Sequence, residues 1–374
     1  MPIRLAVPNE ILPGERRIAL EPGVAKRLLG MGVEVCMEKG AALSSHFADS
    51  AFEDVALIDS PAALYKGASL VFKVQPPTLE ELDMIDDGAV IVSFMQPHKN
   101  RDLMKKMCAK KITSLAMELV PRISRAQSMD ALSSQAAIAG YKGALMGADL
   151  ASVFFPMLTT AAGTIRPARV VVIGAGVAGL QAIATARRLG AVVEAYDVRS
   201  ATREQCESLG AKFIDTGVKA EGEGGYAREL TAEEKQQQRD VLAKHIATAD
   251  VVISTAAIPG RPSPKIIDRE MVNNMKVGAV IVDLASEGGG NCELTVPGET
   301  VNFEDRVTVH GPLNVPSQVP IHASEMYAKN LFNLVSPFIS ESGELTLDFE
   351  DDVIAGCVLT RDGEIIPEQY KAEQ

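Results

Sequence analysis

The sequence is poor in aromatic residues and in paired cysteines. It contains no tryptophan, aromatics make up only 5% of its 374 residues, and glycine occurs 30 times, so we expect an aliphatic core with many tight turns. Its five cysteines are scattered and form no CxxC pair. This pattern excludes a disulfide scaffold and a zinc finger, and we predict no metal site.

Long apolar runs and an excess of positive charge are also missing. Two long stretches without Asp, Glu, Lys or Arg, 150–165 and 170–186, fall short of the roughly 20 apolar residues that a spanning helix needs. We therefore expect no direct membrane insertion, and the opening MPIRLAVPNE lacks the features of a secretory signal, which favours a cytoplasmic location. The net charge of −12 argues against binding to nucleic acid or to anionic lipid.

Short β-branched runs alternate with helical stretches, a pattern typical of βαβ units and parallel sheets. The length allows two domains. Strands are predicted in the first domain at 4–8, 33–37, 70–74, 89–94 and 112–117, and in the second at 169–173, 192–196, 212–214, 251–255, 279–284 and 307–310.

Helices are expected over 131–155 and 322–334, and strand-like pieces over 345–349 and 353–359. We predict that the last stretch returns to the first domain. The N-terminal domain would then comprise 1–135 and 312–374, and the second domain 136–311.

A GxGxxG motif, Gly174 to Gly179, directly follows the apolar strand 170–173 and opens a helix. Gly174 permits a tight turn, Gly176 lets the backbone approach a pyrophosphate, and Gly179 lets the helix pack closely on the sheet. Free N–H groups at the helix N-terminus favour the phosphates. The other interpretation is a glycine turn without a ligand.

Asp197 ends the next strand, where an acidic side chain accepts hydrogen bonds from the adenosine ribose. A carboxylate at this place repels a 2′-phosphate, so NAD(H) is favoured over NADP(H). Arg199 leaves two possibilities open: it serves a 2′-phosphate, or it lies over the adenine. The fold predicted is α/β, with two Rossmann-like domains on parallel β-sheets and the cofactor in the interdomain cleft.

Two further segments are candidates for function. Residues 118–135 are dense in donors and acceptors and lie between the predicted domains, but Asp130 followed by Ser133 is also a helix-capping pattern. The glycine-rich stretch 215–238 is either a functional loop or a surface loop. No histidine lies beside a carboxylate at catalytic spacing, and no HExxH, GxSxG or Walker motif occurs. Cofactor binding is thus better supported than proton transfer.

The stretches PRISRAQSMDALSSQ, RVVVIGAGVAGLQAIATARRLGA, GGYAREL, AAIPGRP and LASEGGGN closely resemble the proton-translocating NAD(P) transhydrogenases, in particular their soluble NAD(H)-binding component, which forms the beginning of the alpha subunit. Alanine dehydrogenases share the fold. The resemblance implies an oxidoreductase and translocase in which NADH bound here passes hydride to NADP+ on a partner component, while a membrane-spanning component moves protons. It also implies a homodimer attached peripherally to the cell membrane through its partner subunits.

The resemblance implies roles for individual residues. The residues around the nicotinamide and its ribose are mostly polar. The residues at the pyrophosphate lie in the glycine motif, and those at the adenosine come after it in the sequence. A mobile loop is implied to close over the nucleotide. The nicotinamide set is Arg122, Gln127, Asp130 and Ser133, with Ile123 and Ser124 on the same wall; Gly174, Gly176, Val177 and Gly179 support the pyrophosphate, and Asp197, Val198 and Arg199 the adenosine; Gly225 and Tyr226 lie in the loop, and Gln238 and Ala257 complete the pocket.

Departures from the alanine dehydrogenases favour transhydrogenation. Where they place a catalytic histidine, this chain reads Ser93-Phe94-Met95-Gln96-Pro97, and His98 is displaced from that position. Where they place an aspartate before a glycine pair, it has Glu287. Arg17 and Lys73 match positions that hold the carboxylate of alanine or pyruvate in those enzymes. An alanine-type dehydrogenase therefore remains the alternative, and a third is a non-catalytic NAD(H)-sensing module. Direct hydride transfer between nucleotides needs no proton donor, which fits the shortage of catalytic acids and bases.

Overall fold

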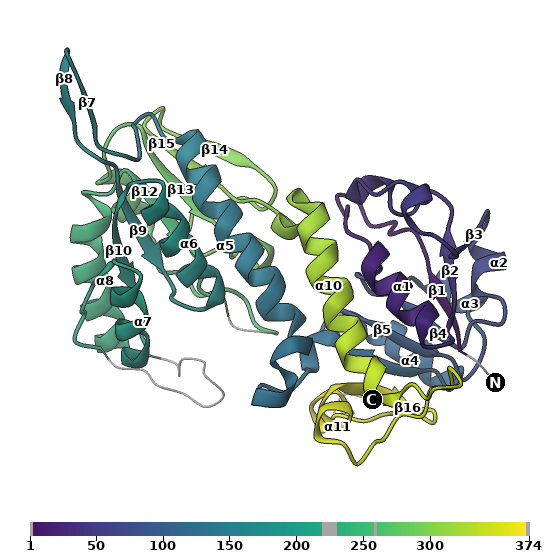
Figure 1. Ribbon diagram of the computed structural model, residues 1–374. Helices are drawn as coiled ribbons and strands as arrows, with labels where there is room; N and C mark the ends of the chain where they lie inside the picture. Colours follow the sequence, from purple (N-terminus) through teal and green to yellow (C-terminus); the bar gives the residue numbers. More distant parts are fainter. Residues whose placement is uncertain (1–2, 219–229, 258–259, 372–374) are drawn as a thin grey trace. The chain divides into compact units, whose positions relative to one another are not determined.

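The computed structural model describes residues 3–218, 230–257 and 260–371. The chain divides into two compact units (Figure 1): unit 1 comprises Met1–Gln135 and Ser317–Gln374, and unit 2 comprises Ala136–Pro316. The chain thus re-enters unit 1 at Ser317, five residues after the return predicted at 312. Each unit is described by itself.

Unit 1 is built on an eight-stranded sheet in the order β17-β16-β6-β5-β4-β1-β2-β3. The six strands from β1 to β6 pair in parallel, and β16 and β17 extend the edge in antiparallel fashion. Their bounds are β1 Arg4–Val7, β2 Glu34–Glu38, β3 Ala56–Ile58, β4 Leu70–Phe72, β5 Val90–Ser93, β6 Thr113–Ala116, β16 Val358–Arg361 and β17 Glu364–Ile365.

The helices of unit 1 are α1 Pro22–Gly30, α2 Pro61–Tyr65, α3 Leu79–Met84, α4 Arg101–Ala109, α10 Pro320–Val335, α11 Asp352–Cys357 and α12 Glu368–Lys371. Alternate strand residues enter cores on opposite faces of the sheet: Leu5 and Val7 lie in one, and Ala6 lies in the other. Strands that are buried on both faces consist of continuous apolar runs, so most of them could be predicted from the sequence.

Unit 2 has a seven-stranded sheet in the order β11-β10-β9-β12-β13-β15-β14. All pairings are parallel except that of β14 with β15. The bounds are β9 Arg169–Ile173, β10 Val192–Tyr196, β11 Lys212–Phe213, β12 Val251–Ser254, β13 Ala279–Asp283, β14 Thr300–Phe303 and β15 Val307–His310; the helices are α6 Val177–Arg188, α7 Arg203–Ser208, α8 Ala232–Ile246 and α9 Arg269–Asn273. The prediction of α/β architecture with parallel sheets is confirmed.

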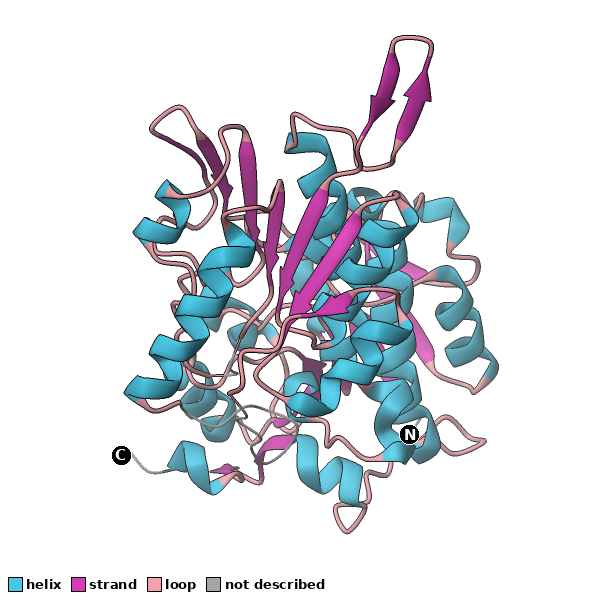
Figure 2. Cartoon of the chain, turned by 90° about the vertical axis from the view of Figure 1, so that its left-hand side faces the viewer, coloured by secondary structure: helices cyan, strands magenta, loops and turns pink. Residues whose placement is uncertain are grey.

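Helix α5 (Ala131–Leu150) begins in unit 1 and continues into unit 2. Its glycines permit close packing within unit 2: a Cβ on Gly140 would lie 2.0 Å from the Ala178 carbonyl oxygen of α6, and one on Gly147 would lie 2.8 Å from Val251 of β12. Beyond α5 the chain forms a separate two-stranded hairpin, β7 (Leu158–Thr160) with β8 (Gly163–Ile165). Figure 2 shows this hairpin projecting from the body of unit 2.

Several expectations about single elements are wrong. The helix predicted to end at 155 ends at Leu150. Residues 353–357 form helix α11 rather than a strand, because the Asp351 side chain accepts hydrogen bonds from the N–H groups of Val353 and Ile354 and so caps a helix. Residues 345–349 contain only an isolated bridge at Leu345. The edge strand β14 was not predicted, because its residues alternate between exposed and half buried and give no apolar run.

Candidate functional site

The strand order of unit 2 has a topological switch point at the carboxyl ends of β9 and β12. Taken as β11-β10-β9-β12-β13-β15, the order is that of a doubly wound sheet that reverses direction between β9 and β12. Dinucleotides bind at such a switch point. The glycine turn, residues 174–179, lies there, because it joins β9 to α6.

The three glycines of this turn meet different constraints. Gly174 has φ +92°, a left-handed conformation that favours glycine. A Cβ on Gly179 would lie 1.8 Å from the Gly174 carbonyl oxygen, so this position requires close packing of α6. At Gly176 a Cβ would meet no atom of the described residues within 4 Å. The backbone at Gly176 is therefore open to the approach of a ligand, and Val177, which follows, is exposed at the start of α6.

Asp197, at the end of β10, connects the glycine turn to Arg199. One carboxylate oxygen accepts from the Ala175 N–H at 2.7 Å and from Arg199 Nη2 at 2.8 Å. The other accepts from Arg199 Nε and from the Arg199 backbone N–H, both at 2.9 Å. Val198, between the two, is half buried. Arg199 thus pairs with the acidic residue, and a ribose at Asp197 would share that carboxylate with it.

Two other predicted pocket residues follow in unit 2. Gln238 of α8 is buried and donates from Nε2 to the hydroxyl of Tyr196 at 2.8 Å. Tyr196 is the last residue of β10, directly before Asp197, so Gln238 contacts the carboxyl end of this strand. Ala257 is exposed beyond β12. Gly225 and Tyr226, predicted to lie in a closing loop, fall outside the described residues.

Asn291 was not singled out in the sequence, although it lies in the LASEGGGN stretch. Its buried side chain accepts from the Ala256 N–H at 3.0 Å and donates to the carbonyl oxygens of Ala256 at 2.7 Å and Pro264 at 2.9 Å. The neighbouring Thr255 donates to the Gly174 carbonyl at 3.1 Å. The segment after β12 is therefore attached to the glycine turn on one side and to the loop after β13 on the other.

The polar segment predicted to contact the nicotinamide lies in unit 1. Residues Ser124–Met129 form a short 3-10 helix, labelled η4, just before α5. Ala126 and Met129 point into the core, whereas Arg122, Ile123, Ser124 and Gln127 are exposed. The exposed and buried side chains of this segment therefore separate into a surface face and a core face.

The helix-capping interpretation of Asp130 is supported by its contacts. The Asp130 carboxylate accepts from the Ser133 backbone N–H at 2.8 Å and from the Ser133 hydroxyl at 2.6 Å, which is the geometry of a cap on α5. A role of these two residues towards the nicotinamide remains a prediction.

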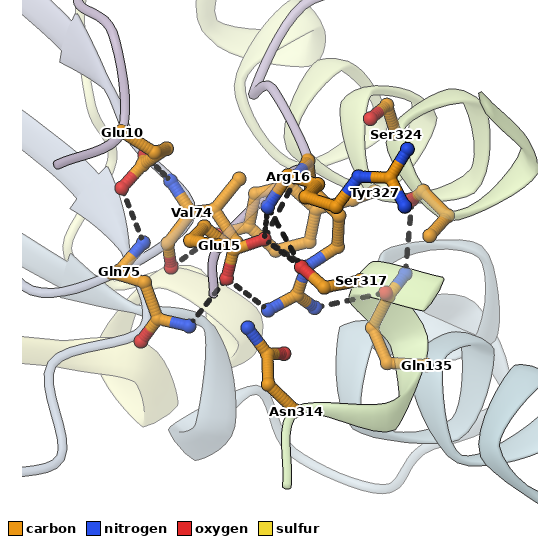
Figure 3. A network of polar contacts seen from close by, with 12 residues as sticks. Glu10, Glu15, Arg16, Val74, Gln75, Gln135, Asn314, Ser317, Ser324 and Tyr327 are labelled. Atoms are coloured by element: carbon orange, nitrogen blue, oxygen red, sulfur yellow. Dashed lines mark hydrogen bonds and ion pairs between the residues drawn. The ribbon is translucent and has the colours of Figure 1, made fainter. Parts of the chain in front are cut away.

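A network of buried charges follows β1 and β4 of unit 1 (Figure 3). The Glu15 carboxylate accepts from Arg17 Nε at 2.8 Å, from Arg17 Nη2 at 2.7 Å and from Gln75 Nε2 at 2.7 Å. Arg17 also donates to Gln135 at 3.0 Å. Burial raises the pKa of the Glu15 carboxyl, but the hydrogen bonds and charge of Arg17 outweigh it and lower this pKa to about 2.

Lys73, beside this network, is only 1% exposed and pairs with Glu81 at 2.9 Å and with Glu10 at 3.5 Å. Burial lowers its pKa, but the two carboxylates outweigh the effect and raise it; for Glu10, burial dominates and raises the pKa above 4.5. Both cations implied by the resemblance to alanine dehydrogenases are therefore paired within the chain. A substrate carboxylate at Arg17 would have to share it with Glu15.

Gln96, in the stretch 93–97 where the resemblance to the alanine dehydrogenases would place a histidine, has φ +47°. Its backbone N–H and that of Met95 donate to the half-buried Glu118 carboxylate at 2.5 and 2.9 Å, and these bonds hold the unusual conformation. His98 is exposed two residues later. Within the described residues, no cluster of His, Cys, Asp and Glu is placed to hold a metal ion, and no helix is long and apolar enough to cross a membrane.

Comparisons with known proteins agree with this arrangement. The family models described as alanine dehydrogenase/PNT, N-terminal domain and C-terminal domain match residues 6–139 and 143–368. In Rhodospirillum rubrum, the first component of a divided NAD(P) transhydrogenase subunit alpha is 47% identical over 376 residues, covering 97% of this chain and 98% of that protein.

Two solved structures are similar over nearly the whole chain. A transhydrogenase from Sinorhizobium meliloti has a TM-score of 0.87 and 42% identity, covering 97% of this chain and 99% of that one. An L-alanine dehydrogenase, at 22% identity and a TM-score of 0.80, covers 99% and 98% and shows likeness of fold alone. The chain therefore belongs to the alanine dehydrogenase/PNT family, in which its close relatives are transhydrogenase alpha subunits.

Proposed function

We propose that this chain is the NAD(H)-binding component of a proton-translocating transhydrogenase. NADH binds at the glycine turn of unit 2 and passes hydride from its C4 to C4 of NADP+ on a partner component, giving NAD+ and NADPH. A membrane-spanning component couples this transfer to proton movement and attaches the chain peripherally to the membrane. The observation that carries the proposal is the glycine turn, open at Gly176 and followed by Asp197, in a chain related to transhydrogenase alpha subunits.

The residues of unit 1 then have a positioning task. Arg122, Gln127, Asp130 and Ser133 surround the nicotinamide and its ribose, beside Ile123 and Ser124. Since hydride moves directly between two nicotinamides, the protein has to hold the reacting carbons about 3–3.5 Å apart and needs no acid or base. This agrees with the absence of a histidine from the stretch 93–97.

The decisive experiment is reconstitution with an NADP(H)-binding partner component. We expect tight NADH binding by the chain alone, and NADPH-dependent reduction of a nicotinamide analogue only when both components are present. Binding of NADH without transfer would instead support an NAD(H) sensor. Turnover of alanine with NAD+, or of pyruvate and ammonia with NADH, would support the amino-acid dehydrogenase alternative.

Replacing Gln127 with asparagine should slow hydride transfer without weakening NADH binding. The shorter side chain keeps the amide but draws it back by one methylene, and a displacement of about 1 Å in a near-attack geometry can cost on the order of 100-fold in rate. We expect the transfer rate to fall by at least about tenfold and the NADH dissociation constant to change by less than about threefold. Single-turnover kinetics and fluorescence titration measure the two quantities.

The matched control is Gln205→Asn, on the exposed surface of α7 in unit 2. It shortens an exposed glutamine in the same way, and both quantities should remain at the wild-type values. A Q127N protein that loses NADH affinity while its transfer step is intact would contradict the role assigned to Gln127.

The β7–β8 hairpin supports the homodimer. All six of its strand residues are exposed, and residues 150–165 carry no charged side chain. Met157 is 65% exposed and Phe154 54%. An isolated two-stranded hairpin is marginally stable in water, so an arm of this kind needs a covering surface. We propose that the hairpin of a second copy of the chain covers it, because two identical uncharged hairpins can pack against each other around a two-fold axis.

Met157→Asp combined with Ile165→Asp should therefore convert a dimer into a monomer. Analytical ultracentrifugation at micromolar concentration should give the wild-type protein twice the 39.8 kDa of one chain, and the variant a single chain mass. Val277→Asp, which charges an exposed apolar position elsewhere in unit 2, should remain dimeric. A wild-type monomer, or a dimeric double variant, would contradict the proposed interface.

A further inference from the structure

The loop of residues 121–130, which carries Gln127, is held by the last part of the chain. Its buried side chains, Ala126 and Met129, belong to the same core as Leu331 of α10 and Val353 of α11. Its exposed side chains include Arg122 and Gln127. The C-terminal elements thus support the core side of this loop, opposite its exposed side chains.

Two asparagines of α10 converge on one carbonyl group of the loop. Asn330 and Asn333 donate from Nδ2 to the Ser128 carbonyl oxygen at 2.9 and 3.1 Å. The Oδ1 atom of Asn330 accepts from the hydroxyl of Ser134 at 2.7 Å, so the same buried side chain also holds the first turns of α5. Ser128 directly follows Gln127, and these bonds therefore restrain the backbone next to the side chain on which hydride transfer is proposed to depend.

An ion pair ties the loop to α11. Arg125 Nη1 donates to Asp351 Oδ2 at 2.7 Å, while Asp351 Oδ1 accepts from the Val353 and Ile354 N–H groups at the start of α11. One carboxylate therefore serves the loop with one oxygen and caps the helix with the other. The side chain of Asp351 is mostly covered, whereas that of Arg125 is about half exposed.

Helix α11 also approaches the beginning of the loop closely. A Cβ on Gly356 would lie 3.0 Å from Cδ of Pro121. The loop is thus fixed at Pro121 by packing, at Arg125 by charge, and at Ser128 by hydrogen bonds. These three attachments lie on both sides of Gln127 in the sequence, and all are made by α10 and α11. Contacts within the loop alone would not hold it in this way.

We propose that the segment 320–357 is a positioning element for hydride transfer, acting through Asn330, Asn333 and Asp351. This inference rests on the proposed function, because it assigns to these residues the orientation of Gln127 towards the partner's nucleotide. We assign none of the three a contact with the nucleotide; they restrict the freedom of a loop whose geometry has to be held within fractions of an ångström.

The test combines Asn330→Ala with Asn333→Ala, and separately compares Asp351→Asn, Arg125→Gln and their double variant. D351N retains an oxygen that caps α11, so it removes the charge pair without removing the cap. We expect each of D351N and R125Q to slow single-turnover hydride transfer by about three- to tenfold, and the double variant to be no slower than either one, because both changes break the same contact.

The two-asparagine variant should slow transfer by at least about tenfold, while the NADH dissociation constant of every variant stays within about threefold of wild type. Lys371→Gln, which breaks an exposed ion pair with Glu368 in the same C-terminal region, is the matched control and should transfer hydride at the wild-type rate. If the folded variants transfer hydride as fast as the control does, the positioning role is overturned.

Amide hydrogen exchange separates this inference from the proposed function. The Ala126 and Asp130 N–H groups bond within the loop, to Ile123 and Gln127 carbonyls. With NADH bound and no partner present, they should exchange faster in the two-asparagine variant than in wild type or K371Q. Faster exchange in a chain that never transfers hydride would support the anchoring and refute the transhydrogenase proposal. Unchanged exchange would refute the anchoring.

Discussion

Gly179→Ala should strongly weaken NADH binding and destabilise unit 2. The added Cβ would lie 1.8 Å from the Gly174 carbonyl oxygen and 2.8 Å from the carbonyl carbon, both of which are backbone atoms of the turn. Such an overlap cannot be relieved by a rotamer change, so α6 has to move away from the sheet. Overpacking costs about 1–3 kcal/mol and occasionally more, and we expect a loss at or above the top of this range.

The displacement of α6 also removes the helix N-terminus from the phosphate position. We expect NADH affinity to fall by at least about 100-fold, because the N–H groups and the dipole at this helix end act only over short distances. Isothermal titration calorimetry measures the affinity, and urea denaturation measures the free energy of unfolding. A stable G179A protein with wild-type affinity would show that the turn does not pack as the structure describes.

Gly176→Ala separates ligand binding from folding. A Cβ at this position meets no atom of the described residues within 4 Å, and the backbone φ of −76° suits alanine. We therefore expect the free energy of unfolding to change by less than about 1 kcal/mol, since only the backbone entropy of the unfolded chain differs. NADH affinity should nevertheless fall sharply, because the methyl group occupies the space through which the pyrophosphate approaches. Full affinity in G176A would argue against a phosphate at this turn.

Glu15→Gln should strongly destabilise unit 1. It removes the charge that neutralises the buried Arg17 guanidinium, and it places an amide where Gln75 and Ser317 now meet a carboxylate. Breaking a buried ion pair by removing one partner costs about 3–5 kcal/mol, because the remaining charge is left buried without compensation. Urea denaturation of the two proteins at pH 7 measures this difference.

The cost of Glu15→Gln should depend on pH in a defined direction. The pKa of Glu15 is lowered from 4.5 to about 2 in the folded protein, so its carboxylate contributes stability above pH 4.5. That contribution is lost as the pH falls from 4.5 towards 2. The difference in unfolding free energy between wild type and E15Q should therefore be constant at neutral pH and shrink below pH 4.5.

Glu10 titrates with the opposite sign. Its pKa is raised by burial, so its contribution to stability is complete below pH 4.5 and decreases as the pH rises through its folded value. It is present in both proteins, but its pKa should be less raised in E15Q because the Glu15 charge contributes to the raise. Asp59→Asn, which breaks the exposed pair with Lys39, is the control and should cost no more than about 1 kcal/mol at any pH. If E15Q cost no more than this control, the Glu15–Arg17 pair would not support unit 1.

Local patterns in the sequence predicted most strands and the glycine turn. The run 169–173 is strand β9 as expected, because a strand buried on both faces needs an apolar side chain at nearly every position. The glycines at 174 and 179 were assigned to conformation and packing, and their φ angle and contacts agree with those assignments. These features could be predicted because each one depends on residues only a few positions away in the sequence.

Contacts between distant residues were not predictable in the same way. Nothing near Ser128 indicates that two asparagines about 200 positions later donate to its carbonyl oxygen. Likewise, residues 353–357 have the apolar composition of a strand, but they form a helix because the Asp351 side chain caps its first turn. Asn291 gave no periodic signal either, because its role is to satisfy backbone groups of another loop.

The division of unit 1 into two sequence segments has a consequence for the order in which the protein is made. Strand β16 pairs with β6 through residues 246 positions apart, Ser114 and Thr360, so the sheet of unit 1 stays incomplete until residues 358–365 have left the ribosome. Unit 2 is one continuous segment that ends at Pro316 and has all its strands by then. Closing so long a loop is slow, and unpaired strand edges are prone to aggregation. The second unit should thus mature first, and the unfinished edge at β6 is where a nascent chain most needs a chaperone.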